Sequence, residues 1–327
     1  MRKYHNLLLF CDFYDIRSGN CQQKRQHNQR GIWRVDYGIS VEEIGQRMKA
    51  FRLGAMLTPE ELAHKAGISR AAIYRYEAGQ PAKIDTLVRI AGLLGVSLAT
   101  LLGAGVEYIV SAISFFERMR QLEENVEQII VLFGPVSYLL TTDQYDEFLP
   151  QVLRESIPKH VDDYDQAISE VDTLVEILKK RKQAYRARTP NIISLTSGSE
   201  LTQFLKLGFV GGHNLPDVDV SKRKEIARIE IENIVQLLRN QPIGVQLGVI
   251  VDSMPGSSLQ IFREANRKSV AVSPYRLGAF ANIRLGVATI SSAPEATELY
   301  QTVTNQLWNR AIKGEQAADY IEKTILK

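Results

Sequence analysis

Cysteine is scarce in this sequence, and both cysteines, Cys11 and Cys21, lie within the first 39 residues. Neither a second cysteine pair nor a close set of histidine ligands accompanies them. A disulfide-stapled fold is therefore excluded, and we expect free thiols in a reducing compartment. Because no zinc-ligand spacing is present, we predict no metal and no cofactor.

Long hydrophobic runs are also absent. No apolar run approaches the ~18 residues of a membrane span. The early NLLLF stretch is too short for a signal peptide and lacks a small-residue cleavage pattern after it. A hydrophobic content of 45% still suffices for real cores, and 327 residues predict roughly two or three domains. We expect a globular cytoplasmic protein with no membrane partner.

The chain has no large excess of positive or negative charge, since its formal net charge is only +3. The charged residues are nevertheless distributed unevenly along it. Lys and Arg number 7 against 3 acidic residues in 1–39, 8 against 6 in 40–103, and 25 against 28 in 104–327. The positive excess therefore lies in the first 103 residues, as expected for a module that meets phosphate followed by one that does not.

Residues 1–39 are rich in Gln, Asn and Arg and show no sustained period. This composition predicts a polar, basic, disordered tail. Two alternatives stay open: the tail is a basic arm that touches DNA, or the start codon has been placed too far upstream.

The chain is organised around residues 40–102, and above all around 58–79. Thr58 and Glu61 have the spacing of a capping box, and Pro59 falls at the first helical position, where no N–H is needed. Gly67 supplies the turn, and Ser69 caps a second helix. Two short helices joined by such a turn form a helix-turn-helix, whose second helix can enter a DNA major groove.

The residues around this motif resemble the DNA-binding domain of phage Cro and C1 repressors, the XRE family of bacterial regulators. The resemblance covers about a fifth of the chain and is carried by 58–63 (TPEELA), 66–69 (AGIS), Ile73, Glu77, Gly79, Leu87, 90–91 (IA), 94–97 (LGVS) and 101–102 (LL). It implies an all-α five-helix domain with double-stranded operator DNA as the partner. We expect no enzymatic activity, because the catalytic constellations in the rest of the chain are weak.

Base contacts are expected from the exposed face of the second helix of the motif. Arg70 and Arg75 are the candidates for bidentate hydrogen bonding to guanine, with Ala71 and Tyr74 beside them. Ala can meet a thymine methyl group. The alternative for each arginine is a phosphate contact or a solvated side chain.

Phosphate contacts are expected at the helix ends: Thr58 with the helix that it caps, Ser69, Gln80 and Lys83. Pro59 departs from the polar residue, such as Gln, that many relatives carry there. Affinity should then depend more on the arginines.

The resemblance also implies an ion pair. Arg52 and Glu77 occupy places where relatives join the first helix to the end of the recognition helix through a semi-buried pair. The alternative is two unrelated surface charges.

After the hinge at residues 103–105, apolar residues recur at three- and four-residue steps until Phe133. This stripe predicts one long amphipathic helix. Its partner is either the same helix in a second subunit, which would make a homodimer, or the C-terminal domain. A short strand is predicted at 136–140 and a helix at 162–188, whose basic end, KKRKQAYRAR, is either a solvated helix end or a second nucleic-acid patch.

From residue 189 the pattern changes to mixed α and β. Strands are predicted at 191–195, 245–251, 258–262, 269–273 and 283–290, and helices at 200–207, 222–240 and 295–311. Interleaved strands and helices favour one α/β domain with a mixed sheet. Loops at 211–212, 255–256 and Pro274 are candidate walls of a ligand pocket.

Catalytic constellations are weak in this half. His160 and His213 have no ligand-spaced partner, and Asp252 near Ser257 has no evident base. Asp252 with three arginines is a candidate site for a small anionic effector, against the alternative of surface ion pairs; the arginines are Arg263, Arg276 and Arg284.

These observations predict a transcription regulator with four parts. A tail occupies 1–39, a DNA-binding domain 40–103, a helical connector that dimerises 104–188, and an α/β effector or oligomerisation domain 189–327. A small-molecule effector is a candidate partner of the last part. The alternative function is an enzyme that carries a fused regulatory helix-turn-helix.

Overall fold

The computed structural model describes residues 40–132, 134–212, 220–252 and 254–327. The predicted tail, both cysteines and His213 lie outside the described residues. Residues Ile39–Lys327 form one compact unit. None of the helices in the described ranges combines the length and the apolar character of a membrane span.

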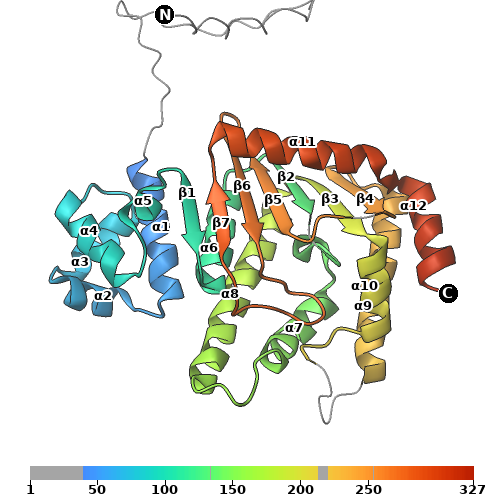
Figure 1. Ribbon diagram of the computed structural model, residues 1–327, viewed down its shortest axis with the longest axis horizontal. Coiled ribbons are helices and arrows are strands. Elements are labelled where there is room, and N and C mark those ends of the chain that lie inside the picture. Colours follow the sequence, from blue (N-terminus) through green and yellow to red (C-terminus); the bar gives the residue numbers. More distant parts are fainter. Residues whose placement is uncertain (1–39, 133, 213–219, 253) are drawn as a thin grey trace, which may run out of the picture. The chain divides into compact units, whose positions relative to one another are not determined.

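The first part of this unit is helical (Figure 1). It contains α1 (Val41–Gly54), α2 (Pro59–Ala66), α3 (Arg70–Glu77), α4 (Ile84–Leu93) and α5 (Leu98–Leu102). One fully buried apolar side chain from each helix packs into a shared core: Met48, Leu62, Ile73, Ile90 and Leu101. The apolar stripes seen in the sequence are therefore core.

The predicted long helix over residues 105–133 is wrong. That stretch forms β1 (Val106–Ile109), α6 (Ala112–Glu123) and β2 (Gln128–Leu132). Ser111 caps the start of α6, and its hydroxyl accepts a hydrogen bond from the Ser114 N–H at 3.3 Å. The spacing of the apolar residues predicted a helix wrongly, because β-branched Ile109 and Ile129 fit a helical stripe but pack equally well in strands.

In the described residues, eight strands form one mixed sheet with the order β1-β7-β6-β5-β2-β3-β4-β8. The remaining strands are β3 (Asn191–Ser197), β4 (Val245–Ile250), β5 (Ser258–Arg263), β6 (Lys268–Ser273), β7 (Ala288–Ser291) and β8 (Ile312–Lys313). Strand β3 is parallel to both β2 and β4, and the other pairs are antiparallel. Because β2 lies between β3 and β5, the sheet does not begin at residue 189, and 104–188 is not a purely helical connector.

Helices cover both faces of this sheet (Figure 1). The helices that follow α6 are α7 (Asp143–Glu155), α8 (Tyr164–Arg188), α9 (Gly198–Leu207), α10 (Val220–Asn240), α11 (Pro294–Arg310) and α12 (Gly314–Tyr320), which runs into a π-helical turn at Ile321–Ile325. Strand β2 shows the two faces. Ile130 and Leu132 pack in the cluster that contains Leu307 of α11, whereas Ile129 and Val131 join the cluster that contains α6, α8 and α10. Burial on both faces explains the continuous apolar run of this strand.

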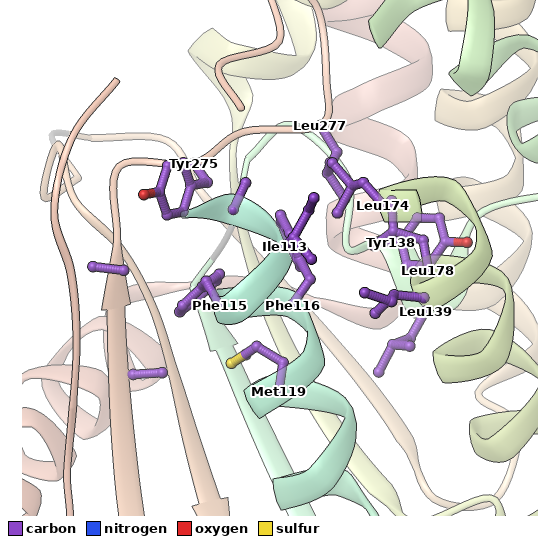
Figure 2. Close-up of a cluster of buried hydrophobic side chains, with 14 of the residues drawn as sticks. Ile113, Phe115, Phe116, Met119, Tyr138, Leu139, Leu174, Leu178, Tyr275 and Leu277 are labelled. Carbon is purple, nitrogen blue, oxygen red and sulfur yellow. The ribbon is translucent and has the colours of Figure 1, made fainter. Parts of the chain in front are cut away.

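Helix α6 contributes many side chains to the hydrophobic cluster that it shares with α8 and α10. Figure 2 shows Ile113, Phe115, Phe116 and Met119 of α6 among side chains of α8 and of the loop after β6. The rings of Phe115 and Phe116 meet edge-on at 5.2 Å between centroids, and Tyr275 lies 5.7 Å from Phe115. The apolar stripe of this region therefore packs within its own chain.

Two smaller predictions are corrected here. The predicted strand at 136–140 is instead a 3-10 turn at Tyr138–Leu140. At the basic end of α8, Arg181 and Lys182 are buried and so belong neither to a solvated helix end nor to a surface patch, whereas the other four basic residues are exposed: Lys179, Lys180, Arg186 and Arg188. Arg181 pairs with Glu123 at 2.6 Å and Lys182 with Asp146 at 2.7 Å.

Candidate DNA-binding surface

Helix α2 begins with the capping box expected from the sequence. The Thr58 hydroxyl accepts a hydrogen bond from the Glu61 N–H at 3.2 Å, and the Glu61 carboxylate accepts the Thr58 N–H at 2.7 Å. The Thr58 N–H holds the pKa of Glu61 below its ordinary value of 4.5, together with the Thr58 hydroxyl, which donates to the same carboxylate at 2.9 Å. Gly67 then turns the chain with φ +64°, a conformation that favours glycine. The exposed start of α2 is therefore fixed before any phosphate arrives.

Helix α3 presents the predicted reading face. Its cap is Ser69, whose hydroxyl accepts the Ala72 N–H at 3.2 Å. Ala72 and Ile73 are buried, whereas the four candidate reading residues are exposed: Arg70, Ala71, Tyr74 and Arg75. One side of this two-turn helix thus anchors it, and the other side is open to a ligand.

The two arginines of this face differ in their contacts. Arg70 forms an ion pair with Glu60 of α2, donates a hydrogen bond to the Tyr74 hydroxyl at 3.1 Å, and lies 5.3 Å from the centre of that ring. For Arg75, no ion pair or side-chain hydrogen bond is found among the described residues. To contact DNA, Arg70 must first break its ion pair with the Glu60 carboxylate, whereas Arg75 has no such pair to break among the described residues.

Gln80 and Lys83 follow α3 and are both exposed. Lys83 is the residue before α4, and its side chain makes no capping hydrogen bond there. Together with Thr58 and Ser69, they place polar and cationic groups at the starts of α2, α3 and α4 and just after α3, where phosphate contacts are expected.

Arg52 and Glu77 lie together as a bidentate pair. Arg52 Nε donates to Glu77 Oε1 at 2.6 Å and Arg52 Nη2 to Oε2 at 3.1 Å. The two side chains are only 7% and 8% exposed. Arg52 Nη1 also donates to the Leu57 carbonyl at 2.7 Å. The pair joins α1 to the last residue of α3 and so holds α3 in place.

A buried polar connection joins the helix-turn-helix to the sheet, and it was not predicted from the sequence. Glu107 of β1 is buried and accepts hydrogen bonds from Arg47 of α1 at 2.7 Å and from Arg118 of α6 at 2.8 Å. Although burial acts to raise the pKa of Glu107, the guanidinium groups of Arg118 and Arg47 outweigh it, and the pKa is lowered. On β1, Glu107 and Ile109 are buried, whereas Tyr108 between them is exposed.

The candidate anion-binding residues are not gathered into one site by the contacts of the described residues. Asp252 pairs with Arg310 at 2.9 Å, and Arg284 pairs with Asp163 at 2.7 Å. Arg276 donates to the Gly256 carbonyl at 3.2 Å. Arg263 is exposed at the end of β5. Within the described ranges, no three His, Cys, Asp or Glu residues could hold a metal ion.

The short helices α2 and α3, joined by the turn at Gly67, form a helix-turn-helix. Residues 48–101 match the family model described as helix-turn-helix, which confirms the XRE-type motif predicted from the sequence. The match begins within α1 and ends within α5, so it covers none of the sheet. No curated protein matches the chain.

Two solved structures are similar to the chain at low TM-scores. TrmBL2, an archaeal chromatin protein whose structure shows a novel mode of DNA binding, is 12% identical over 82% of this chain and 92% of its own, with a TM-score of 0.31. The apo form of the competence regulator ComR from Streptococcus vestibularis is 18% identical over 61% of this chain and 50% of its own, with a TM-score of 0.19. The family match is the comparison on which the assignment of the motif rests.

Proposed function

We propose that this chain is a sequence-specific DNA-binding transcription regulator in which α3 reads the major groove. The observation that carries the proposal is the outward face of α3, where Arg75, Tyr74 and Ala71 are exposed beside the capped start of α2. Because Arg75 has no ion pair with any residue that the structure describes, it can donate two hydrogen bonds to guanine without first breaking such a pair.

Selection of bound sequences from random DNA by the full chain tests this proposal. A single enriched motif is expected, and Arg75→Ala should weaken binding to it by about 1–3 kcal/mol while sparing random DNA. Arg75→Lys is the matched control, because it keeps the charge and loses the planar fork. If Arg75→Lys binds the selected site as well as the native chain, Arg75 contacts phosphate and not a base.

We further propose that the regulator binds DNA as a homodimer and that the sheet domain serves sensing or oligomerisation. The dimer is expected from the helix-turn-helix itself, since such modules commonly read two half-sites, and it needs no long helix at 105–133. Light scattering of the full chain with and without selected DNA is the test. A monomeric mass in both samples would contradict the dimer.

A further inference from the structure

A cavity of about 320 Å³ lies at the junction of the helix-turn-helix with the sheet. The end of α1, the turn between α4 and α5, strand β1 and the start of α6 all contribute to it, through residues that include Phe51, Val96, Tyr108 and Ser111. We call it the junction pocket. Its size is at the lower end of the range that small-molecule sites span, ~300–1,000 Å³.

The walls of the junction pocket carry no charge. All of its lining residues are apolar, glycine, serine, threonine or tyrosine. Phe51 and Ile109 are buried at its base, whereas Tyr108 and Val110 are 60% and 70% exposed at its rim. A charged ligand would lose hydration here without meeting an opposite charge, which is costly. The pocket therefore favours a neutral, mainly apolar molecule.

Two hydroxyl groups of the lining give this ligand a polar contact. Thr100 Oγ1 accepts a hydrogen bond from Ser97 Oγ at 3.0 Å, and Ser111 Oγ accepts one from the Ser114 N–H at 3.3 Å. Neither hydroxyl donates to an acceptor within the part of the chain that the structure describes. Each can therefore donate its own hydrogen to a ligand oxygen.

We propose that the junction pocket binds a small neutral aromatic or aliphatic molecule that carries one hydrogen-bonding oxygen. Such a ligand contacts the DNA-binding part and the sheet part of the chain at once. Those parts also touch directly beside the pocket, where Ser114 Oγ of α6 donates to the Ala50 carbonyl of α1 at 3.2 Å. The ligand therefore favours one arrangement of the reading helix relative to the sheet, and DNA and ligand affect each other's affinity. This last consequence rests on the proposed DNA-binding function, whereas the site itself does not.

Binding of 2-naphthol to the full chain without DNA tests the site. This probe is neutral at neutral pH and has one hydroxyl oxygen, and 2-naphthoate is its anionic counterpart of similar shape. By calorimetric titration, 2-naphthol should bind saturably and at least about tenfold more tightly than 2-naphthoate. The absence of saturable binding up to millimolar probe, or equal affinity for the two probes, would overturn the proposal.

Two variants locate the probe. Ala55→Phe places a large side chain at the pocket wall and should lower the affinity for 2-naphthol at least about tenfold. Ala265→Phe is the matched control, because Ala265 is exposed in the turn between β5 and β6, outside the lining, and should leave the affinity unchanged. If Ala55→Phe fails to fold, Val110→Lys at the exposed rim should instead reduce the preference for 2-naphthol over 2-naphthoate. Native-like binding by both lining variants would place the probe elsewhere and overturn the assignment.

A final measurement separates the site from its regulatory role. Saturating 2-naphthol should change the affinity of the native chain for its selected DNA at least about threefold and leave that of Ala55→Phe unchanged. Probe binding without any effect on DNA affinity would overturn the coupling. Failure of the chain to select any DNA would refute the proposed function and leave the probe titration as the measure of the site.

Discussion

The substitution Glu77→Ala should release the recognition helix from α1. In the native chain, the Glu77 carboxylate accepts two hydrogen bonds from Arg52, and both side chains are more than nine-tenths buried. Truncation to alanine removes both bonds and leaves the guanidinium with its single bond to the Leu57 carbonyl. An uncompensated charge then stays in a poorly hydrated place.

The expected loss can be bounded from this geometry. Removing one partner of a buried pair costs about 3–5 kcal/mol, whereas exposed pairs contribute about 0.2–1 kcal/mol. Exposures of 7% and 8% place this pair with the buried ones, and the remaining bond to Leu57 favours the lower end. We expect a loss of about 3 kcal/mol, a large part of the ~5–15 kcal/mol that a domain has in total.

Amide hydrogen exchange on the full chain measures this loss where it occurs. Because α3 should open more often, its amides should exchange faster by the factor that corresponds to about 3 kcal/mol, while β2 and β3 keep their protection. DNA binding should weaken as a consequence, although no DNA contact has been removed. The double change Arg52→Met with Glu77→Leu should restore much of the protection, since two apolar side chains leave no charge stranded.

Glu60→Ala is the matched control on the same module. It also removes a carboxylate that pairs with an arginine, but its partner Arg70 is largely exposed, so the protection of α3 should change far less. The reasoning is refuted if Glu77→Ala and Glu60→Ala have the same small effect, or if the Arg52 and Glu77 single changes are additive.

Two further predictions concern charges beside this module. Because the pKa of Glu107 is lowered in the folded chain, its stabilisation of the junction is complete above the ordinary value of 4.5 and is lost as pH falls through the lowered value. Protection of β1 amides should follow that acid transition in the native chain, and Glu107→Gln should abolish the transition. Glu60→Gln should free Arg70 for phosphate and so strengthen binding to random DNA more than binding to the selected site; an unchanged ratio of the two affinities in matched titrations would contradict this competition.

The elements that form from local chemistry were predictable from the sequence. Thr58 with Glu61, Ser69 and Gly67 act within one turn of their own position, so the start and end of α2 and the start of α3 follow from residue type. The pair of Arg52 and Glu77 joins positions 25 apart, and it was expected only because of the resemblance to a known family. Strands β3 to β6 and helices α8 to α11 were predicted at nearly their observed bounds, because their patterns are long and have clear turn residues between them.

The region between the motif and the sheet was decided by tertiary structure. An apolar stripe at three- and four-residue steps is compatible with one long helix. It is equally compatible with a strand–helix–strand arrangement, which forms here because β1 pairs with β7 and β2 pairs with β3. The burial of Glu107, Arg181 and Lys182 has the same origin, since each charge is neutralised by a partner from another element. The helix-turn-helix could be predicted from the chain alone, because its caps and its turn are local. The way in which the motif joins the sheet depends on the packing of α1 against α6 and β1, which also forms the junction pocket. Such features cannot be predicted locally, because buried charge pairs and shared cavities form only between segments that folding brings together.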